Sequence, residues 1–175
     1  MRIYSRKEWG AASPQSAMST QSSPTEAFIH YSDDVGVGSI DTFAEQAGKA
    51  RAIQDFHLHG RGWSDIAYHY LVFQPYGGLR RARVFAARGD RFVPAAQAGH
   101  NTGTLAICVV AGPGVALKRN TRYAIEQILR RYPSVKTVGG HRDVVATDCP
   151  GDVIYSWIPR IARASGKKVY KGGNS

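Results

Sequence analysis

The chain has 175 residues, of which 43% are hydrophobic and 21% are charged, as in an ordinary soluble globular protein. This length favours a single domain whose core needs neither disulfides nor a structural metal. The two cysteines, Cys108 and Cys149, lie in unlike surroundings, which argues against a disulfide framework, and no stretch approaches the length of a membrane span.

The formal net charge is +10, from 23 Lys and Arg residues against 13 Asp and Glu residues. Such an excess favours a polyanionic partner, which could be nucleic acid, an anionic cell envelope or a membrane surface. The alternative is that the charge only keeps the protein in solution. The N-terminal segment MRIYSRKEWG has a positive start without the apolar run of a secretory signal, so no ordinary signal peptide is predicted.

The first third of the chain is predicted to hold an arm, a strand and a helix. Residues 1–24 are expected to form an irregular arm, rich in Ser, Gln, Thr and Pro, with Trp9 among its few apolar anchors. Residues 27–31 (AFIHY) are the first strand candidate and carry His30 near their end. An approximate helical stripe of apolar residues predicts a helix over 39–59.

The middle of the chain has the pattern of a buried sheet. Residues 66–74 are rich in β-formers and mostly apolar, which suits a central strand. Residues 75–78 (PYGG) are predicted to turn the chain, after which residues 82–87 return as an antiparallel hairpin partner. Residues 105–111 are another buried strand, in which Cys108 fits as a small core thiol.

The last third is predicted to alternate again between helix and strand. Asn120 is expected to cap a long helix, which is followed by a short strand over 135–138. Residues 152–164 have the pattern of a final helix that Pro159 should kink or interrupt. Residues 166–175 are expected to be a flexible basic tail or the start of a linker.

Helices interleaved with buried strands and one hairpin predict an α/β fold, with a central mixed β-sheet flanked by helices. We therefore expect one domain over residues 1–165, which includes the N-terminal arm 1–24. Residues 166–175 are expected to lie outside it.

The stretch from Val138 to Gly151 holds the residues with the most reactive chemistry. His141 and Cys149 lie eight positions apart, in a segment with too much Gly and Pro for one helix. An imidazole and a thiolate that converge in a loop suit a borderline-soft ion such as Zn²⁺. The alternative is a buried thiol near a surface histidine.

A third ligand candidate is His30, because it ends a buried strand, where α/β folds present ligands and catalytic groups. His57 and His59 lie two positions apart near a helix end and cannot chelate together, and His69 could be a core residue. Three N/S ligands from separate segments would leave one tetrahedral position open, as in catalytic zinc sites. Residue spacing alone leaves this interpretation open.

With these residues placed, the chain resembles the zinc-dependent N-acetylmuramoyl-L-alanine amidases of the type 2 family, which includes phage lysozyme-amidases and peptidoglycan recognition proteins. The resemblance runs from Ile3 to about Trp157 and rests on five segments in the family's order. The segments are SRKEWGA (5–11), FIHYS (28–32), ARAIQDFHLHGRGWSDIAYHYLV (50–72), GHNTGTLAICVVAG (99–112) and GGHRDVVATDCPG (139–151).

The resemblance implies one Zn²⁺ per chain, bound by His30, His141 and Cys149. Tyr68 matches the tyrosine that hydrogen-bonds around the metal-bound water or the substrate carbonyl. Thr147 stands where phage enzymes of the family tend to carry lysine, whereas catalytic peptidoglycan recognition proteins can carry threonine there. We therefore expect Tyr68 and Thr147 to be the catalytic side chains, with a hydroxyl donor in place of a full positive charge.

The implied partner is bacterial peptidoglycan, cut at the amide between the lactyl group of N-acetylmuramic acid and L-alanine of the stem peptide. Trp63, His100 and Asn101 are candidate groove residues, although Trp63 could instead anchor a loop. The main alternative is a non-catalytic peptidoglycan-binding module. Members of that kind typically lack the cysteine ligand, which is present here as Cys149.

Two further alternative functions lack a supporting motif in the sequence. A nucleic-acid partner is suggested by the net charge alone, since the basic residues are dispersed and no nucleic-acid-binding motif appears. A different zinc hydrolase is disfavoured because the HExxH signature is absent. We expect a monomer without integral membrane contact, in the setting of a phage endolysin that is made in the host cytoplasm and acts on the cell wall after membrane permeabilisation.

Overall fold

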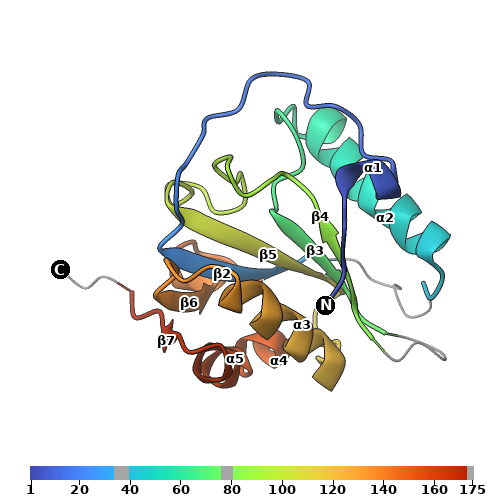
Figure 1. The fold of residues 1–175 in the computed structure, drawn as a ribbon. Helices are drawn as coiled ribbons and strands as arrows, with labels where there is room; N and C mark the ends of the chain where they lie inside the picture. The colour runs from blue at the N-terminus through green and yellow to red at the C-terminus, as the bar shows by residue number, and fades with distance from the viewer. Residues whose placement is uncertain (34–39, 76–80, 173–175) are drawn as a thin grey trace.

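The computed structural model describes residues 1–33, 40–75 and 81–172, which form one mixed β-sheet with helices on both faces (Figure 1). The strand order is β1-β4-β3-β5-β2-β6-β7, and neighbouring strands are parallel except for the β3–β4 pair. This confirms the predicted fold class. The strands are β1 (Ile3–Tyr4), β2 (Glu26–Tyr31), β3 (Tyr70–Phe73), β4 (Arg83–Ala86), β5 (Thr104–Val110), β6 (Thr137–Gly140) and β7 (Lys168–Val169). The helices are α1 (Arg6–Trp9), α2 (Phe43–Asp55), α3 (Arg119–Arg130), α4 (Asp152–Tyr155) and α5 (Ile158–Ala164), with a π-helical turn over Phe56–Gly60 and a 3-10 turn over His141–Asp143.

The two faces of the sheet bury separate apolar clusters. On one face, Ile128 of α3 and Ile161 of α5 pack with sheet residues such as Ile107. On the other face, Trp9 of α1 and Ile53 of α2 pack with a second set of sheet residues. Because both faces are covered, β5 is buried along its whole length, which explains its unbroken apolar sequence.

The N-terminal segment is more ordered than an irregular arm. Ser5 and Glu8 form a capping box at the start of α1, and β1 pairs with β4. Trp9 is fully buried, as expected of an anchor, and its Nε1 donates to the carbonyl of Ala86 at 2.8 Å. Arg6 Nη1 lies 2.8 Å from a carboxylate oxygen of the buried Asp65. These contacts join the segment to the core of the domain.

The hairpin of β3 and β4 is confirmed, although β3 starts at Tyr70 rather than at residue 66. The helix predicted over 39–59 is α2, which begins at Phe43, where Thr42 and Glu45 form a capping box. Ser39 and residues 76–78 of the expected turn lie outside the described residues. Within the described part of the chain, no helix combines the length and the apolar character needed to cross a bilayer.

The C-terminal third departs from its predicted boundaries. The N-cap of α3 is Lys118 rather than Asn120, and β6 begins at Thr137, two residues later than expected. The final helix is interrupted, as Pro159 predicted, because that residue lies in the first turn of the separate helix α5. The expected flexible tail instead contributes β7, whose backbone pairs with β6 as the edge of the sheet.

Candidate metal centre

Three side chains of the metal-ligating type meet at the carboxyl ends of two neighbouring strands. β2 and β6 pair in parallel with Ile29 opposite Gly140, so His30 on β2 lies beside His141, which follows β6. Their ring centroids are 4.6 Å apart. Cys149 returns to the same place, and the candidate ligand atoms of all three residues lie within 4.8 Å of one another.

The loop after β6 is held in a shape that brings Cys149 back to His141. The Asp143 carboxylate accepts hydrogen bonds from the Gly140 amide at 2.8 Å and from the Tyr155 hydroxyl at 2.6 Å. The amide of Arg142 donates to the carbonyl of Cys149 at 2.9 Å. The loop is also packed tightly, because a Cβ atom at Gly140 would lie 2.8 Å from the Tyr155 ring.

A chain of buried hydrogen bonds fixes the orientation of His30. The Thr104 hydroxyl donates to the carbonyl of Asn101 at 2.6 Å, so its oxygen accepts from Gln97 Nε2, also at 2.6 Å. The Gln97 amide oxygen therefore faces His30 Nε2, at 3.1 Å, and accepts its proton. This leaves Nδ1 of His30 as the unprotonated nitrogen, and it points to Cys149 Sγ at 3.9 Å.

Burial shifts the pKa values of His30 and Cys149 toward their neutral forms. Burial, and then the neighbouring His141 ring, hold the pKa of His30 well below its usual value, so this imidazole is neutral. Burial raises the pKa of the Cys149 thiol to about 11, although the Tyr31 amide donates to its sulfur at 3.4 Å and acts in the opposite direction. A bound cation would lower the pKa of the Cys149 thiol, because thiols deprotonate on coordination.

The donor set and its spacing fit a zinc ion. Metal–nitrogen bonds of about 2.0 Å and metal–sulfur bonds of about 2.3 Å place tetrahedral N and S ligand atoms roughly 3.5 Å apart. The 3.9 Å between His30 Nδ1 and Cys149 Sγ is close to that separation. The second ring nitrogen of His30 is already bonded to Gln97, as is usual for a metal-ligating histidine.

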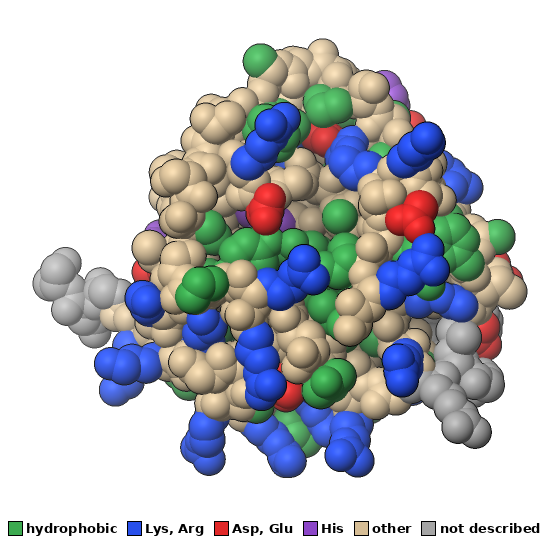
Figure 2. Space-filling model, in the orientation of Figure 1, with side chains coloured by type: hydrophobic (Ala, Val, Ile, Leu, Met, Phe, Trp, Pro, Cys, Tyr) green, Lys and Arg blue, Asp and Glu red, His purple; other side chains and the backbone are tan. Residues whose placement is uncertain are grey.

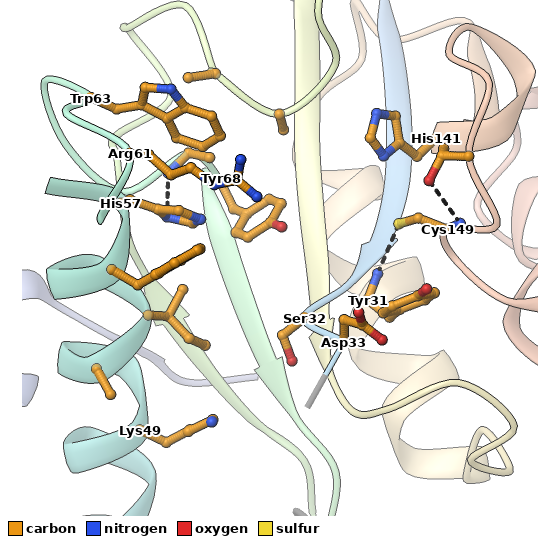
Figure 3. Close-up of a pocket in the computed structure, with 17 residues that line it drawn as sticks. Tyr31, Ser32, Asp33, Lys49, His57, Arg61, Trp63, Tyr68, His141 and Cys149 are labelled. Carbon is orange, nitrogen blue, oxygen red and sulfur yellow. Dashed lines mark hydrogen bonds between the residues drawn. The ribbon is translucent and has the colours of Figure 1, made fainter. Parts of the chain in front are cut away.

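Two of the candidate ligands, His141 and Cys149, line a cleft of about 590 Å³ between α2 and the loop after β6, and His30 is buried behind it (Figure 3). Tyr68 and Trp63 line the wall across from His141 and Cys149, and the Tyr68 hydroxyl points into the cleft. The Tyr68 ring lies 5.3 Å from the His30 ring, measured between centroids. Tyr68 precedes β3 rather than lying in a strand, so it is a loop residue at the metal site.

Thr147 also lines the cleft, and its hydroxyl oxygen accepts a hydrogen bond from the Cys149 amide at 3.3 Å. His100 and Asn101 lie elsewhere. His100 is bonded to Glu26 at the opposite end of β2, at 2.7 Å, and Asn101 Oδ1 accepts from the amide of Gln97 at 2.9 Å. Among the described residues, neither lines the cleft. Both instead form hydrogen bonds with the backbone of Gln97.

The structure adds residues to the site that sequence reasoning missed. Gln97 is fully buried behind His30, and no motif marks it in the sequence. His57 stacks on Trp63 with ring centroids 5.0 Å apart, and its Nδ1 accepts from the Ala67 amide at 3.2 Å. Burial, followed by the charge of Arg61, lowers the pKa of His57 to about 4, so it is neutral. Arg61 lies on the same wall of the cleft.

No protein-family model matches the chain. A human N-acetylmuramoyl-L-alanine amidase is 26% identical over 95% of this chain. The peptidoglycan-recognition protein SD of Drosophila simulans is 27% identical over 89% of this chain and 83% of its own length. A solved structure of tracheal cytotoxin bound to the ectodomain complex of peptidoglycan recognition proteins LCa and LCx is 25% identical, with a TM-score of 0.79 over 91% of this chain and 96% of the other.

These relatives share a family but differ in what they are named for. One group is named for amidase activity and the other for peptidoglycan recognition. The chain spans only 31% of the length of the human amidase. The comparisons confirm the fold, and they show that the relatives of this chain are amidases and peptidoglycan-recognition proteins.

Proposed function

We propose that this chain is a zinc-dependent amidase that hydrolyses the bond between the lactyl group of N-acetylmuramic acid and L-alanine of peptidoglycan stem peptides. The observation that carries the proposal is the convergence of His30, His141 and Cys149, of which His141 and Cys149 line an open cleft and His30 lies buried behind them. When bound, Zn²⁺ supplies a Lewis acid that polarises a carbonyl and lowers the pKa of water from about 15.7 to roughly 7.

The remaining chemistry falls to side chains around the ligands. The Tyr68 hydroxyl is directed into the cleft and can donate to the carbonyl oxygen as negative charge develops on it. One such donor contributes about 3 kcal/mol to transition-state stabilisation. Its pKa of about 4 makes His57 neutral and only weakly basic at neutral pH, so we do not assign it a proton-transfer role. It supports Trp63 instead.

Thr147 is proposed to act as a second donor, in the place of the lysine expected in phage relatives. Its oxygen already accepts from the Cys149 amide, so its own proton remains to be donated toward the cleft. A hydroxyl contributes less charge stabilisation than an ammonium group would. We therefore assign the larger part of oxyanion stabilisation to Tyr68.

The cleft also suits a glycopeptide. Trp63 offers an aromatic face for a sugar or a peptide plane, and Arg61 can pair with the carboxylates of a stem peptide. The presence of Cys149 favours an amidase over a non-catalytic binding module, since recognition of peptidoglycan alone does not need a thiol ligand for a metal. The proposed setting is that of a monomeric phage endolysin, tested by lysis on cytoplasmic expression with and without a membrane permeabiliser.

Metal analysis and hydrolysis of a soluble muramoyl peptide test the proposal. The purified chain should bind one zinc and release peptides that begin with L-alanine, identified by mass. Cys149→Ala should lose both, whereas Cys108→Ala, which removes the other buried cysteine, should keep both. Zinc binding without cleavage would favour the binding module, and full activity in Cys149→Ala would overturn the ligand assignment.

A further inference from the structure

The positive charge of the chain is concentrated in its last third. Residues 115–175 contain 12 of the 23 Lys and Arg residues but only 4 of the 13 Asp and Glu residues. This part therefore carries +8 of the net charge of +10. The remaining residues, which include most of the cleft, are close to electrically balanced.

The fold places much of this charge on one side of the molecule. α3 and α5 cover the sheet face opposite the one that holds α2, and α2 forms a wall of the cleft. Lys and Arg side chains gather along the lower part of the space-filling view, where Figure 1 shows α3, α4 and α5 (Figure 2). We call the exposed surface of α3 and α5 the basic face.

The charges of the basic face are only partly compensated, by the one acidic residue of α3, Glu126. In residues 1–33, 40–75 and 81–172, no carboxylate oxygen lies within 4.0 Å of the arginines of α3 and α5. Burial and then the like charges of Arg160 and Arg119 lower the pKa of Arg122, and the nearby carboxylate of Glu126 only partly offsets them. A cluster of arginines that repel one another stabilises the protein little by itself, which points to an external anion.

Aromatic side chains lie among these arginines. The guanidinium of Arg122 lies 3.6 Å from the centroid of the Trp157 ring, and that of Arg160 lies 5.5 Å from it. Tyr123 of α3 is 56% exposed, although it is a large aromatic residue. Trp, Tyr and Arg together are the residues that proteins place at the level of lipid headgroups.

We infer that the basic face docks on a bilayer surface that contains anionic phospholipids. The charged side chains lie along two neighbouring helices, which suits a broad surface of phosphates. Because the basic face and the cleft lie on opposite sides of the sheet, the protein can bind a membrane while the cleft faces away from it. The inference concerns a different surface from the cleft and does not depend on amidase activity.

Vesicle co-sedimentation of the full chain tests this inference. Binding is expected to phosphatidylcholine vesicles that contain phosphatidylglycerol, to weaken with salt, and to be absent with phosphatidylcholine alone. Removing three arginines in Arg119→Gln/Arg160→Gln/Arg163→Gln should lower the partition coefficient about 100-fold, at roughly fivefold per charge. The matched variant Lys7→Gln/Arg81→Gln/Arg91→Gln removes equal charge elsewhere and should retain most of the binding.

Two readouts separate docking at this face from general charge attraction. Trp157 fluorescence should shift on vesicle addition, and Trp157→Phe should abolish the shift while Trp63→Phe keeps it. Hydrolysis of a soluble muramoyl peptide should be unchanged in both triple variants, so that failure here and failure of the proposed activity are distinguishable. Equal losses in the two triple variants, or tighter binding to a short DNA duplex or to soluble polyphosphate than to vesicles, would overturn the inference.

Discussion

Gln97→Leu tests how the proposed zinc site is pre-organised. In the described residues, Gln97 supplies the hydrogen-bond acceptor for His30 Nε2, at 3.1 Å, and it is fully buried. Leucine fills a similar volume but accepts no proton. His30 would then carry its proton on Nδ1 in part of the molecules, and that nitrogen is the one directed toward Cys149. Zinc binding must first reverse this tautomer.

The expected effect is a 10- to 100-fold loss of zinc affinity, or about 1.4–2.8 kcal/mol, which is typical when the partner of a metal-ligating histidine is removed. Chelator competition measures the affinity. The ¹⁵N chemical shifts of the His30 ring in the metal-free protein report the tautomer directly. The Thr104 hydroxyl loses a donor but keeps its bond to the Asn101 carbonyl, so unfolding should become easier by only about 1–2 kcal/mol.

Gln74→Leu is the matched control. Gln74 is equally buried, and its amide oxygen accepts from the Lys118 amide and the Thr121 hydroxyl, away from the cleft. It should lose a similar amount of stability and no zinc affinity. If Gln97→Leu folds with unchanged zinc affinity and an unchanged His30 tautomer, the role assigned to Gln97 is wrong.

Four further predictions concern the site and the core. Tyr68→Phe should lower kcat by about 10²–10³-fold with zinc content unchanged, and a mere rise in KM would make Tyr68 a binding residue. Thr147→Ser should keep its rate while Thr147→Val loses about tenfold, and equal rates would remove Thr147 from the mechanism. Gly140→Ala, whose Cβ would lie 2.8 Å from the Tyr155 ring, should cost about 1–3 kcal/mol of unfolding free energy and weaken zinc binding, whereas Gly48→Ala in α2 should slightly stabilise the protein. Burial lowers the pKa of His69 from 6.5 to about 4, so the unfolded chain binds a proton in this range that the folded chain excludes. His69 should therefore lower the unfolding free energy by at most about 3 kcal/mol as pH drops from 6.5 to 4, and His69→Gln should remove that share of the dependence in urea titrations, while His30 and His57 keep theirs.

The parts of the fold that could be predicted are those whose signal lies in the side chains. The apolar run of β5 identified a doubly covered strand, and the hairpin of β3 and β4 followed from two β-rich runs around a turn. The parts that were missed depend on backbone pairing. β7 has only two residues, both exposed, and it forms because β6 offers unpaired backbone groups at the sheet edge.

The sequence does carry a local signal for α1, whereas the partner of His30 has none. Ser5 and Glu8 have the spacing of a capping box, which would have predicted α1 inside the supposed arm. At the site, His30, His141 and Cys149 are brought together as the spacing and the resemblance suggested. Gln97 could not be found in this way, because a glutamine in a loop becomes a partner of His30 only through the register of β2, β5 and the chain between them.

The positions of the candidate ligands along the chain have a consequence for folding. His30 and Cys149 are 119 residues apart, so an ion held between them would cross-link the first long strand to the end of the loop after β6. A covalent cross-link that closes a loop of about 100 residues removes roughly 4–5 kcal/mol of chain entropy from the unfolded state. A coordinated metal would restrict the same ensemble in the same way. Chelation would then loosen the whole domain, and protease resistance would report zinc occupancy as directly as catalysis does.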